Sequence, residues 1–158
     1  MSEPSPRNGL IYAALALAVL SLGVAVFALF GAPADEPEFT EGERSDAKVA
    51  ICAAFETVTK GVAMNTNLQP PGGSGDIAGA LAVAANARVA LSDGGQYLLA
   101  RLAPAAPADL TREIVSFGNQ LMDIGAAATA GVPNTDPVQA GRLTAAEAAS
   151  TAITGLCR

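Results

Sequence analysis

The sequence predicts an all-α protein: one N-terminal transmembrane helix, then an antiparallel up-down four-helix bundle with an extra short helix and one disulfide. Three observations lead to this fold class. Residues 10–30 form an uncharged apolar run, residues 45–158 show helical periodicity broken by Pro and Gly, and the two cysteines lie near the ends of that second region. Helices joined by short loops favour an up-down arrangement, because consecutive helices then pack side by side.

The run from Leu10 to Phe30 has the length of a membrane span. As a helix it rises about 31 Å at roughly 1.5 Å per residue, and a helix satisfies its own backbone hydrogen bonds in lipid. A cleaved signal peptide is the rival interpretation, because Ala32-Pro33-Ala34 has the small-x-small form that signal peptidase accepts. The run is longer than the roughly 7 to 15 apolar residues of a signal peptide. We therefore expect an uncleaved anchor.

The flanking charges predict the topology of this anchor. Arg7 and the amino terminus precede the run, whereas five acidic residues follow it between residues 35 and 43. Basic residues are retained on the cytoplasmic side of the cell membrane. We therefore expect residues 1–9 in the cytoplasm and the domain of residues 45–158 outside, where an even number of cysteines suits a disulfide.

Residues 31–44 are expected to be an acidic linker that contains Pro and Gly. Its charges repel one another, so it should be extended and reach about 40 Å at roughly 3.3 Å per residue. It is a plain spacer or, alternatively, a binding segment for a basic partner. With these acids set aside, the remaining charges nearly balance, and the domain has no basic footprint for nucleic acid.

The first half of the domain predicts two helices and a short extra one. A first helix is expected over residues 45–68, with Ser45 as its N-cap, because Pro70-Pro71 cannot continue it. Asp76 should cap a second helix over residues 77–91, which Asp93-Gly94-Gly95 should end. Residues 96–102 are expected to form one or two further turns. The inward stripe of the first helix consists of Val49, Cys52, Phe55, Val58 and Val62.

The second half carries the clearest pattern of the domain. A third helix opens near Pro107 and keeps a heptad seam until Gly131, formed by Leu110, Ile114, Phe117, Leu121, Ile124 and Ala128. Gly118 and Gly125 beside that seam should allow a neighbouring backbone to come close. Asp136 and Pro137 should start a fourth helix, whose inward line is Leu143, Ala146, Ser150, Ile153 and Cys157.

Cys52 and Cys157 are expected to form the disulfide. In an up-down bundle the start of the first helix and the end of the last lie at the same end, so pairing requires no change of path. Closing a loop of roughly 100 residues stabilises a fold by about 4.7 kcal/mol in the chain-entropy model. The alternative is two unpaired buried thiols.

Residue types exclude most catalytic chemistry. The chain has no His, which rules out Ser-His and Cys-His nucleophiles, most zinc sites and the Glu-x-x-His di-iron motif. The cysteines do not form a CxxC pair, and no nucleotide-binding glycine loop occurs. We therefore expect a protein that is not an enzyme, with no catalytic or metal-binding residue and no cofactor.

Two candidate contact sites remain. Arg88 lies on the apolar side of the second helix, where it is either a snorkelling stem or ion-pair partner, or a contact for an anion or lipid headgroup. The connector of residues 93–106 is the most apolar one. Its candidate partner contacts, which could instead close the end of the core, are Tyr97, Leu98, Leu99, Arg101 and Leu102.

The chain also resembles a known group of proteins. It has a short polar N-terminus, one anchor, an acidic Pro-containing linker and an Ala-rich helical domain, with the segment VAICAAFETV at residues 49–58 and a final Leu156-Cys157. In these features it resembles the alanine- and proline-rich single-pass membrane proteins of mycobacteria and related actinobacteria, whose function is unassigned. The resemblance implies a location in the cell envelope and no catalytic residues.

These observations favour a membrane-anchored extracytoplasmic accessory or scaffold protein that docks onto a larger cell-envelope membrane complex. Its partners would be the lipid bilayer, through Leu10 to Phe30, and another membrane or envelope protein, with no nucleic acid. The alternative is a carrier or sensor that binds an apolar ligand or lipid within the helical bundle. A cavity of several hundred Å³ would favour the carrier, whereas an exposed apolar patch would favour the scaffold.

Overall fold

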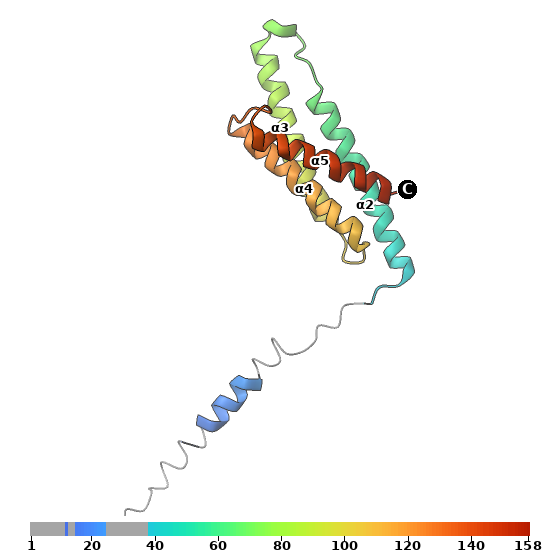
Figure 1. The fold of residues 1–158 in the computed structure, drawn as a ribbon, viewed down its shortest axis with the longest axis vertical. Coiled ribbons are helices and arrows are strands. Elements are labelled where there is room, and N and C mark those ends of the chain that lie inside the picture. The colour runs from blue at the N-terminus through green and yellow to red at the C-terminus, as the bar shows by residue number, and fades with distance from the viewer. Residues whose placement is uncertain (1–11, 13–14, 25–37) are drawn as a thin grey trace, which may run out of the picture. The chain divides into compact units, whose positions relative to one another are not determined.

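The computed structural model describes Tyr12, residues 15–24 and residues 38–158. The chain divides into two compact units, Met1–Glu38 and Phe39–Arg158. Within the described residues the secondary structure is helical, without strands. The second unit contains α2 (Glu41–Thr66), the short 3₁₀ turn η1 (Gly73–Gly75), α3 (Ile77–Arg101), α4 (Ala108–Thr129) and α5 (Pro137–Leu156) (Figure 1).

Part of the expected anchor can be followed in the first unit. Tyr12 and residues 15–24 are helical, while the rest of the run, the segment 1–9 and residues 31–37 of the expected linker lie outside the described residues. Among the helices that the structure describes, none combines the length and the apolar character that a bilayer span requires.

Helix α2 begins four residues earlier than the sequence pattern indicated. Thr40, not Ser45, is the N-cap, and it forms a capping box with Glu43. The Thr40 hydroxyl accepts from the Glu43 backbone N–H at 3.3 Å, and the Glu43 carboxylate accepts from the Thr40 N–H at 2.8 Å. The predicted end of the linker at residue 44 is therefore wrong. Residues 41–44 form the first turn of α2, where acidic side chains favour a helix N-terminus.

Helix α3 continues through the predicted stop at Gly94-Gly95, so the separate short helix at residues 96–102 is wrong. The helix runs without interruption to Arg101, and only Leu102 lies beyond it. Glycine costs a helix about 1 kcal/mol relative to Ala. Here both glycines are packing sites, because a Cβ on Gly94 would collide with Val58 of α2, and one on Gly95 would collide with Gly118 of α4. Close tertiary contact thus outweighs the local signal.

The predicted caps at Asp76, Gly131 and Asp136 are confirmed, as is the seam of α4 apart from Ala128, which is half-buried. Gly131 adopts φ +82°, and the N–H groups of Val132 and Gly131 donate to the carbonyls of Ala127 and Ala128, which is a Schellman ending for α4. The Asp136 carboxylate accepts from two N–H groups in the first turn of α5, and Asp76 caps α3 by accepting from the N–H of Gly79. The heptad residues of α4 are buried: Leu110, Ile114, Phe117, Leu121 and Ile124.

The helices pack in chain order, α2 on α3, α3 on α4 and α4 on α5. The rings of Phe55 and Phe117 meet edge to face within the core, with centroids 5.4 Å apart. The predicted disulfide is confirmed: Cys52 of α2 and Cys157 after α5 are bonded, with their Cα atoms 5.8 Å apart. It joins the first and the last helix of the second unit, which are not otherwise among the closely packed pairs.

Two predicted core positions are wrong. Val49 is 66% exposed and Leu143 is 36% exposed, so the inward stripes of α2 and α5 are shifted from the predicted ones, and the stripe of α5 begins at the buried Gln139. The buried residues of α2 begin at Ala47 and end at Val58, and those of α3 begin only at Leu91. The outer part of the α2–α3 hairpin therefore extends past the α4–α5 hairpin (Figure 1).

Candidate functional site

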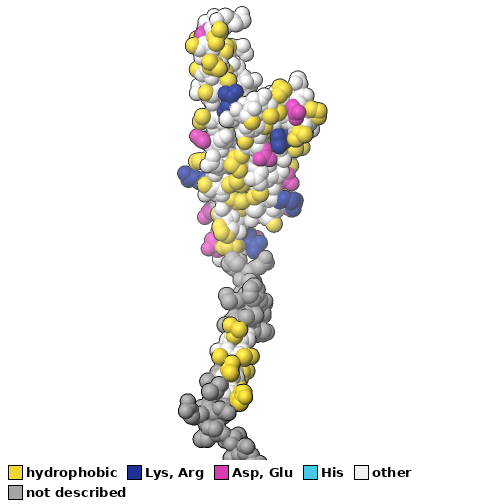
Figure 2. Space-filling model, turned by 90° about the vertical axis from the view of Figure 1, so that its left-hand side faces the viewer, with side chains coloured by type: hydrophobic (Ala, Val, Ile, Leu, Met, Phe, Trp, Pro, Cys, Tyr) yellow, Lys and Arg dark blue, Asp and Glu magenta, His cyan; other side chains and the backbone are white. Residues whose placement is uncertain are grey.

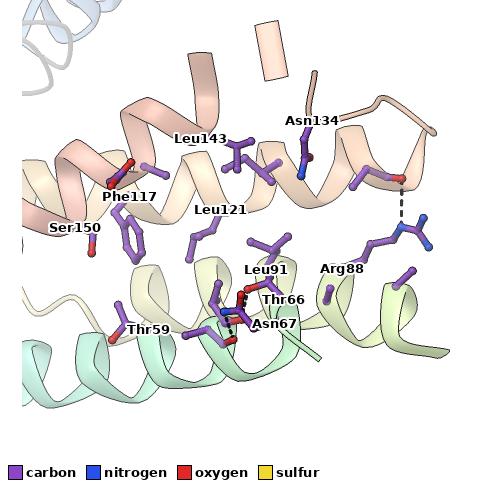
Figure 3. Close-up of a pocket in the computed structure, with 18 residues that line it drawn as sticks. Thr59, Thr66, Asn67, Arg88, Leu91, Phe117, Leu121, Asn134, Leu143 and Ser150 are labelled. Atoms are coloured by element: carbon purple, nitrogen blue, oxygen red, sulfur yellow. Dashed lines mark hydrogen bonds between the residues drawn. The ribbon is translucent and has the colours of Figure 1, made fainter. Parts of the chain in front are cut away.

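The second unit contains a groove of about 930 Å³ to which all four long helices contribute. It begins about two turns from the disulfide on both joined helices, at Thr59 on α2 and at Ser150 on α5. Figure 3 shows α4 and α5 along one side of this space and α2 and α3 along the other. The disulfide joins α2 to the C-terminal end of α5. From there the groove lies toward the C-terminus of α2 and toward the N-terminus of α5.

The floor of the groove is apolar and comes from α3 and α4. Leu91, Phe117 and Leu121 point into it (Figure 3). These three side chains belong to the hydrophobic core, so the floor of the groove is the edge of that core. The walls come from α2 and α5, which contribute Val62 and Leu143. A mainly apolar surface with a few polar groups is typical of sites for small organic ligands.

The polar side chains of the α2 wall are mostly engaged with their own helix. The Thr59 hydroxyl donates to the Phe55 carbonyl at 2.9 Å, and the Asn67 amide donates to the Ala63 carbonyl at 2.7 Å. These bonds consume donors that would otherwise be offered to the groove. The α2 wall is thus less polar than its sequence suggests.

Arg88 stands at one end of the groove, where α4 finishes. Its Nε–H donates to the carbonyl of Ala128 at 3.2 Å, across 40 residues of chain. A cation at a helix C-terminus interacts favourably with the unpaired carbonyls there. This bond uses one of the five guanidinium N–H groups. The two terminal amino groups of Arg88 make no hydrogen bond or ion pair within the part of the chain that the structure describes.

The second predicted site lies at the C-terminal end of α3, and the structure divides it. Leu98 is fully buried, so the docking role considered for it is wrong, and Leu102 packs against the core, as expected if these residues close the core. Leu99 is half-buried and reaches Gly118 of α4. Tyr97 and Arg101 stay exposed, with the guanidinium 4.8 Å from the ring centroid.

Sequence reasoning missed the most exposed apolar region of the second unit. We name residues 61–87 the hairpin tip, since they comprise the end of α2, the loop with η1 and the start of α3. Figure 2 shows hydrophobic side chains over this projecting end. Its large exposed side chains are Met64, Leu68, Ile77 and Leu81. The sequence signal was the absence of charge, because Asp76 is the one charged residue among these 27 positions.

Among the described residues, no group of three or more His, Cys, Asp or Glu side chains could hold a metal ion. Two of the ion pairs found there are exposed on both sides, Lys60 with Glu56 at 2.6 Å and Arg112 with Asp109 at 3.0 Å. No known protein family, curated protein or solved structure matches this chain. The groove and the hairpin tip are therefore the two features from which function can be argued.

Proposed function

We propose that this chain is a membrane-anchored extracytoplasmic accessory protein that docks onto a larger cell-envelope membrane complex through the hairpin tip. In this proposal the apolar run of residues 10–30 is a single-pass anchor with a cytoplasmic N-terminus, and the four long helices form an up-down bundle. The protein is not an enzyme. The uncharged length of the anchor and the acidic residues that follow it support this location.

The observation that carries the proposal is the exposed apolar surface of the hairpin tip. Single exposed apolar residues are common on soluble surfaces. Here Ile77 is 77% exposed, Met64 71% and Leu81 66%, and all three lie on one projecting element. Clustered exposed apolar side chains mark interaction sites, because their contact with water is unfavourable.

Charge supports a protein partner for the same surface. The Asp76 carboxylate accepts hydrogen bonds from Gly79 and Gly72, so it serves as the cap of α3. The hairpin tip thus offers apolar, small and uncharged polar side chains, and its one carboxylate is hydrogen-bonded. The cores of protein interfaces are likewise depleted of charged residues. A second membrane or envelope protein fits this surface, whereas nucleic acid, which needs a basic patch, does not.

The test compares two charge substitutions in the full chain, expressed in the organism from which it comes. Ile77→Lys with Leu81→Lys places two charges on the hairpin tip. Val49→Lys places a charge at an equally exposed position of α2 outside it. After extraction in a mild detergent, one defined membrane protein should co-purify with the wild type and the control. Its recovery should fall at least tenfold with the tip variant, at unchanged melting temperature. Equal recovery from all three chains would refute the proposal.

A carrier or sensor of an apolar ligand is the second candidate function. The groove of about 930 Å³ favours it, since ligand sites in proteins span about 300 to 1,000 Å³. The groove and the hairpin tip share part of residues 61–87, but the exposed apolar side chains of the tip do not line the groove, so the two functions can coexist in one chain.

A further inference from the structure

We infer that the groove between α2 and α5 binds one anionic single-chain amphiphile, with its acyl chain over Leu91, Phe117 and Leu121 and its carboxylate or phosphate at Arg88. This inference rests on the second candidate function, and it does not involve Met64, Leu68, Ile77 or Leu81, the exposed side chains through which the hairpin tip is proposed to dock.

The floor of the groove sets the length and the chemistry of the chain that it can hold. From Ala128, beside Arg88, to Phe117 the floor follows α4 for 11 residues, or about 16 Å at roughly 1.5 Å per residue. Along this path the α4 side chains in the groove are apolar: Ala128, Ile124, Leu121 and Phe117. An extended acyl chain matches this narrow apolar track.

The cation at one end determines which headgroup fits. Arg88 is the only Lys or Arg among the residues that line the groove. Its Nε–H bond to Ala128 fixes the guanidinium at the end of the track and leaves the N–H groups of both terminal nitrogens for another acceptor. A guanidinium fork binds carboxylate and phosphate oxygens in pairs. Asn134, from the loop between α4 and α5, lies across the groove toward the same end and adds an amide (Figure 3).

The other charged residue of the groove gives the ligand its direction. The buried Gln139 side chain donates to the Ile124 carbonyl at 3.1 Å, which sets the register of α5 against α4. Because these helices run in opposite directions, Glu147 lies two turns further along α5, at the level of Phe117 and away from Arg88. An anionic headgroup is thus repelled at the Glu147 end and attracted at the Arg88 end.

The test uses the full chain in lipid nanodiscs and a photoreactive fatty acid, a 16-carbon carboxylic acid with a diazirine in its chain. The matching 16-carbon alcohol carries the same diazirine and no charge. After illumination, the extent of labelling is measured on the tryptic peptide 113–142, which contains the α4 floor and Asn134. In the wild type we expect the acid to label this peptide at least fivefold more than the alcohol, and palmitate to compete. Equal labelling by acid and alcohol would overturn the inference without any variant.

Two matched pairs of variants locate the site. Arg88→Gln should lower labelling by the acid at least fivefold, whereas Arg101→Gln, at the exposed cation on Tyr97, should leave it unchanged. Ala87→Phe fills the groove and should abolish labelling, whereas Ala85→Phe, at an exposed position of the same helix that does not line the groove, should not. Labelling of Arg88→Gln at the wild-type level would refute the headgroup assignment, and labelling of Ala87→Phe at that level would refute the groove.

Competition distinguishes the sources of the anion. Lysophosphatidic acid and palmitate both carry one chain, and the stronger competitor identifies a phosphate or a carboxylate headgroup. Inorganic phosphate should not compete, because it lacks the chain, and its competition would contradict an amphiphile. The Leu81→Lys variant of the hairpin tip should retain wild-type labelling, so failure of the docking proposal and failure of this inference remain distinguishable.

Discussion

Replacing Gly95 by Ala should destabilise the protein, although the same exchange in an open helix stabilises it. A Cβ on Gly95 would lie under 3.0 Å from the carbonyl oxygen of Gly118 and 2.7 Å from Cγ of Met122. The methionine side chain can turn aside, but the backbone of α4 cannot. The added methyl group must therefore push α3 and α4 apart at the place where their backbones meet.

The size of the effect follows from two opposing contributions to the free energy of unfolding. Ala is preferred to Gly in a helix interior by about 1 kcal/mol. Overpacking a close contact costs about 1 to 3 kcal/mol, and a collision with backbone belongs at the upper end of that range. We expect a net loss of about 1 to 2 kcal/mol for Gly95→Ala. Gly118→Ala should cost less, because its Cβ would lie 3.2 Å from the Gly95 carbonyl oxygen.

Urea unfolding of the full chain in detergent micelles, followed by circular dichroism at 222 nm, measures this loss. With a slope of about 2 kcal/mol per M, Gly95→Ala should lower the midpoint by about 0.5 to 1 M. Gly141→Ala in α5 is the matched control, since nothing lies within 4 Å of its added Cβ. The control should raise the midpoint. A Gly95→Ala midpoint at or above the wild-type value would show that α3 and α4 do not touch backbone to backbone there.

Three further predictions concern the disulfide, the core and the first cap. Cys52→Ser should lower the free energy of unfolding by about 2 to 5 kcal/mol, as measured by urea unfolding. The free Cys157 thiol should then react with a maleimide. An unchanged urea midpoint would contradict a stabilising disulfide. Leu98→Ala should cost about 2 to 5 kcal/mol, because the side chain is fully buried, and a loss below about 1 kcal/mol would place it at the surface. Hydrogen bonds from the Thr40 backbone N–H and, as the smaller cause, from the Thr40 hydroxyl hold the pKa of Glu43 below its ordinary value. A carboxyl group whose pKa is lowered by folding stabilises the folded state at pH values above its ordinary pKa. This stabilisation is lost as the pH falls through the lowered pKa of the folded state. In an NMR titration Thr40→Val should raise the pKa of Glu43 toward its ordinary value, and an unmoved pKa would argue against the capping box.

The sequence correctly predicted structural features that depend on residues close together in the chain. The heptad seam of α4, its end at Gly131 and the cap at Asp136 depend on residues within one or two turns of each other. The capping box at Thr40 and Glu43 was equally readable, because Thr-x-x-Glu before a helix is its usual sequence signature. The interpretation of that stretch as a linker gave weight to its charge and overlooked this spacing.

Features that depend on distances between helices could not be read in the same way. Gly94-Gly95 is a helix breaker by propensity, and only the backbone of α4 beside it explains why α3 continues. The bond from Arg88 to Ala128 joins positions 40 residues apart, so the pattern of α3 alone left its partner open. The groove depends on how α2 and α5 separate beyond the disulfide, which no periodicity within one helix encodes.

The position of the disulfide has a mechanical consequence. A pulling force applied between Phe39 and the carboxyl end of the chain reaches Cys52 after 13 residues and then crosses the sulfur bridge to Cys157. The two cysteines are separated by 105 positions in the sequence, and the chain between them carries none of that load. Only the start of α2 can unravel, and the stretched segment then spans at most about 45 Å at roughly 3.3 to 3.6 Å per residue. The groove and the hairpin tip therefore keep their shape while the segment that leads to them is stretched.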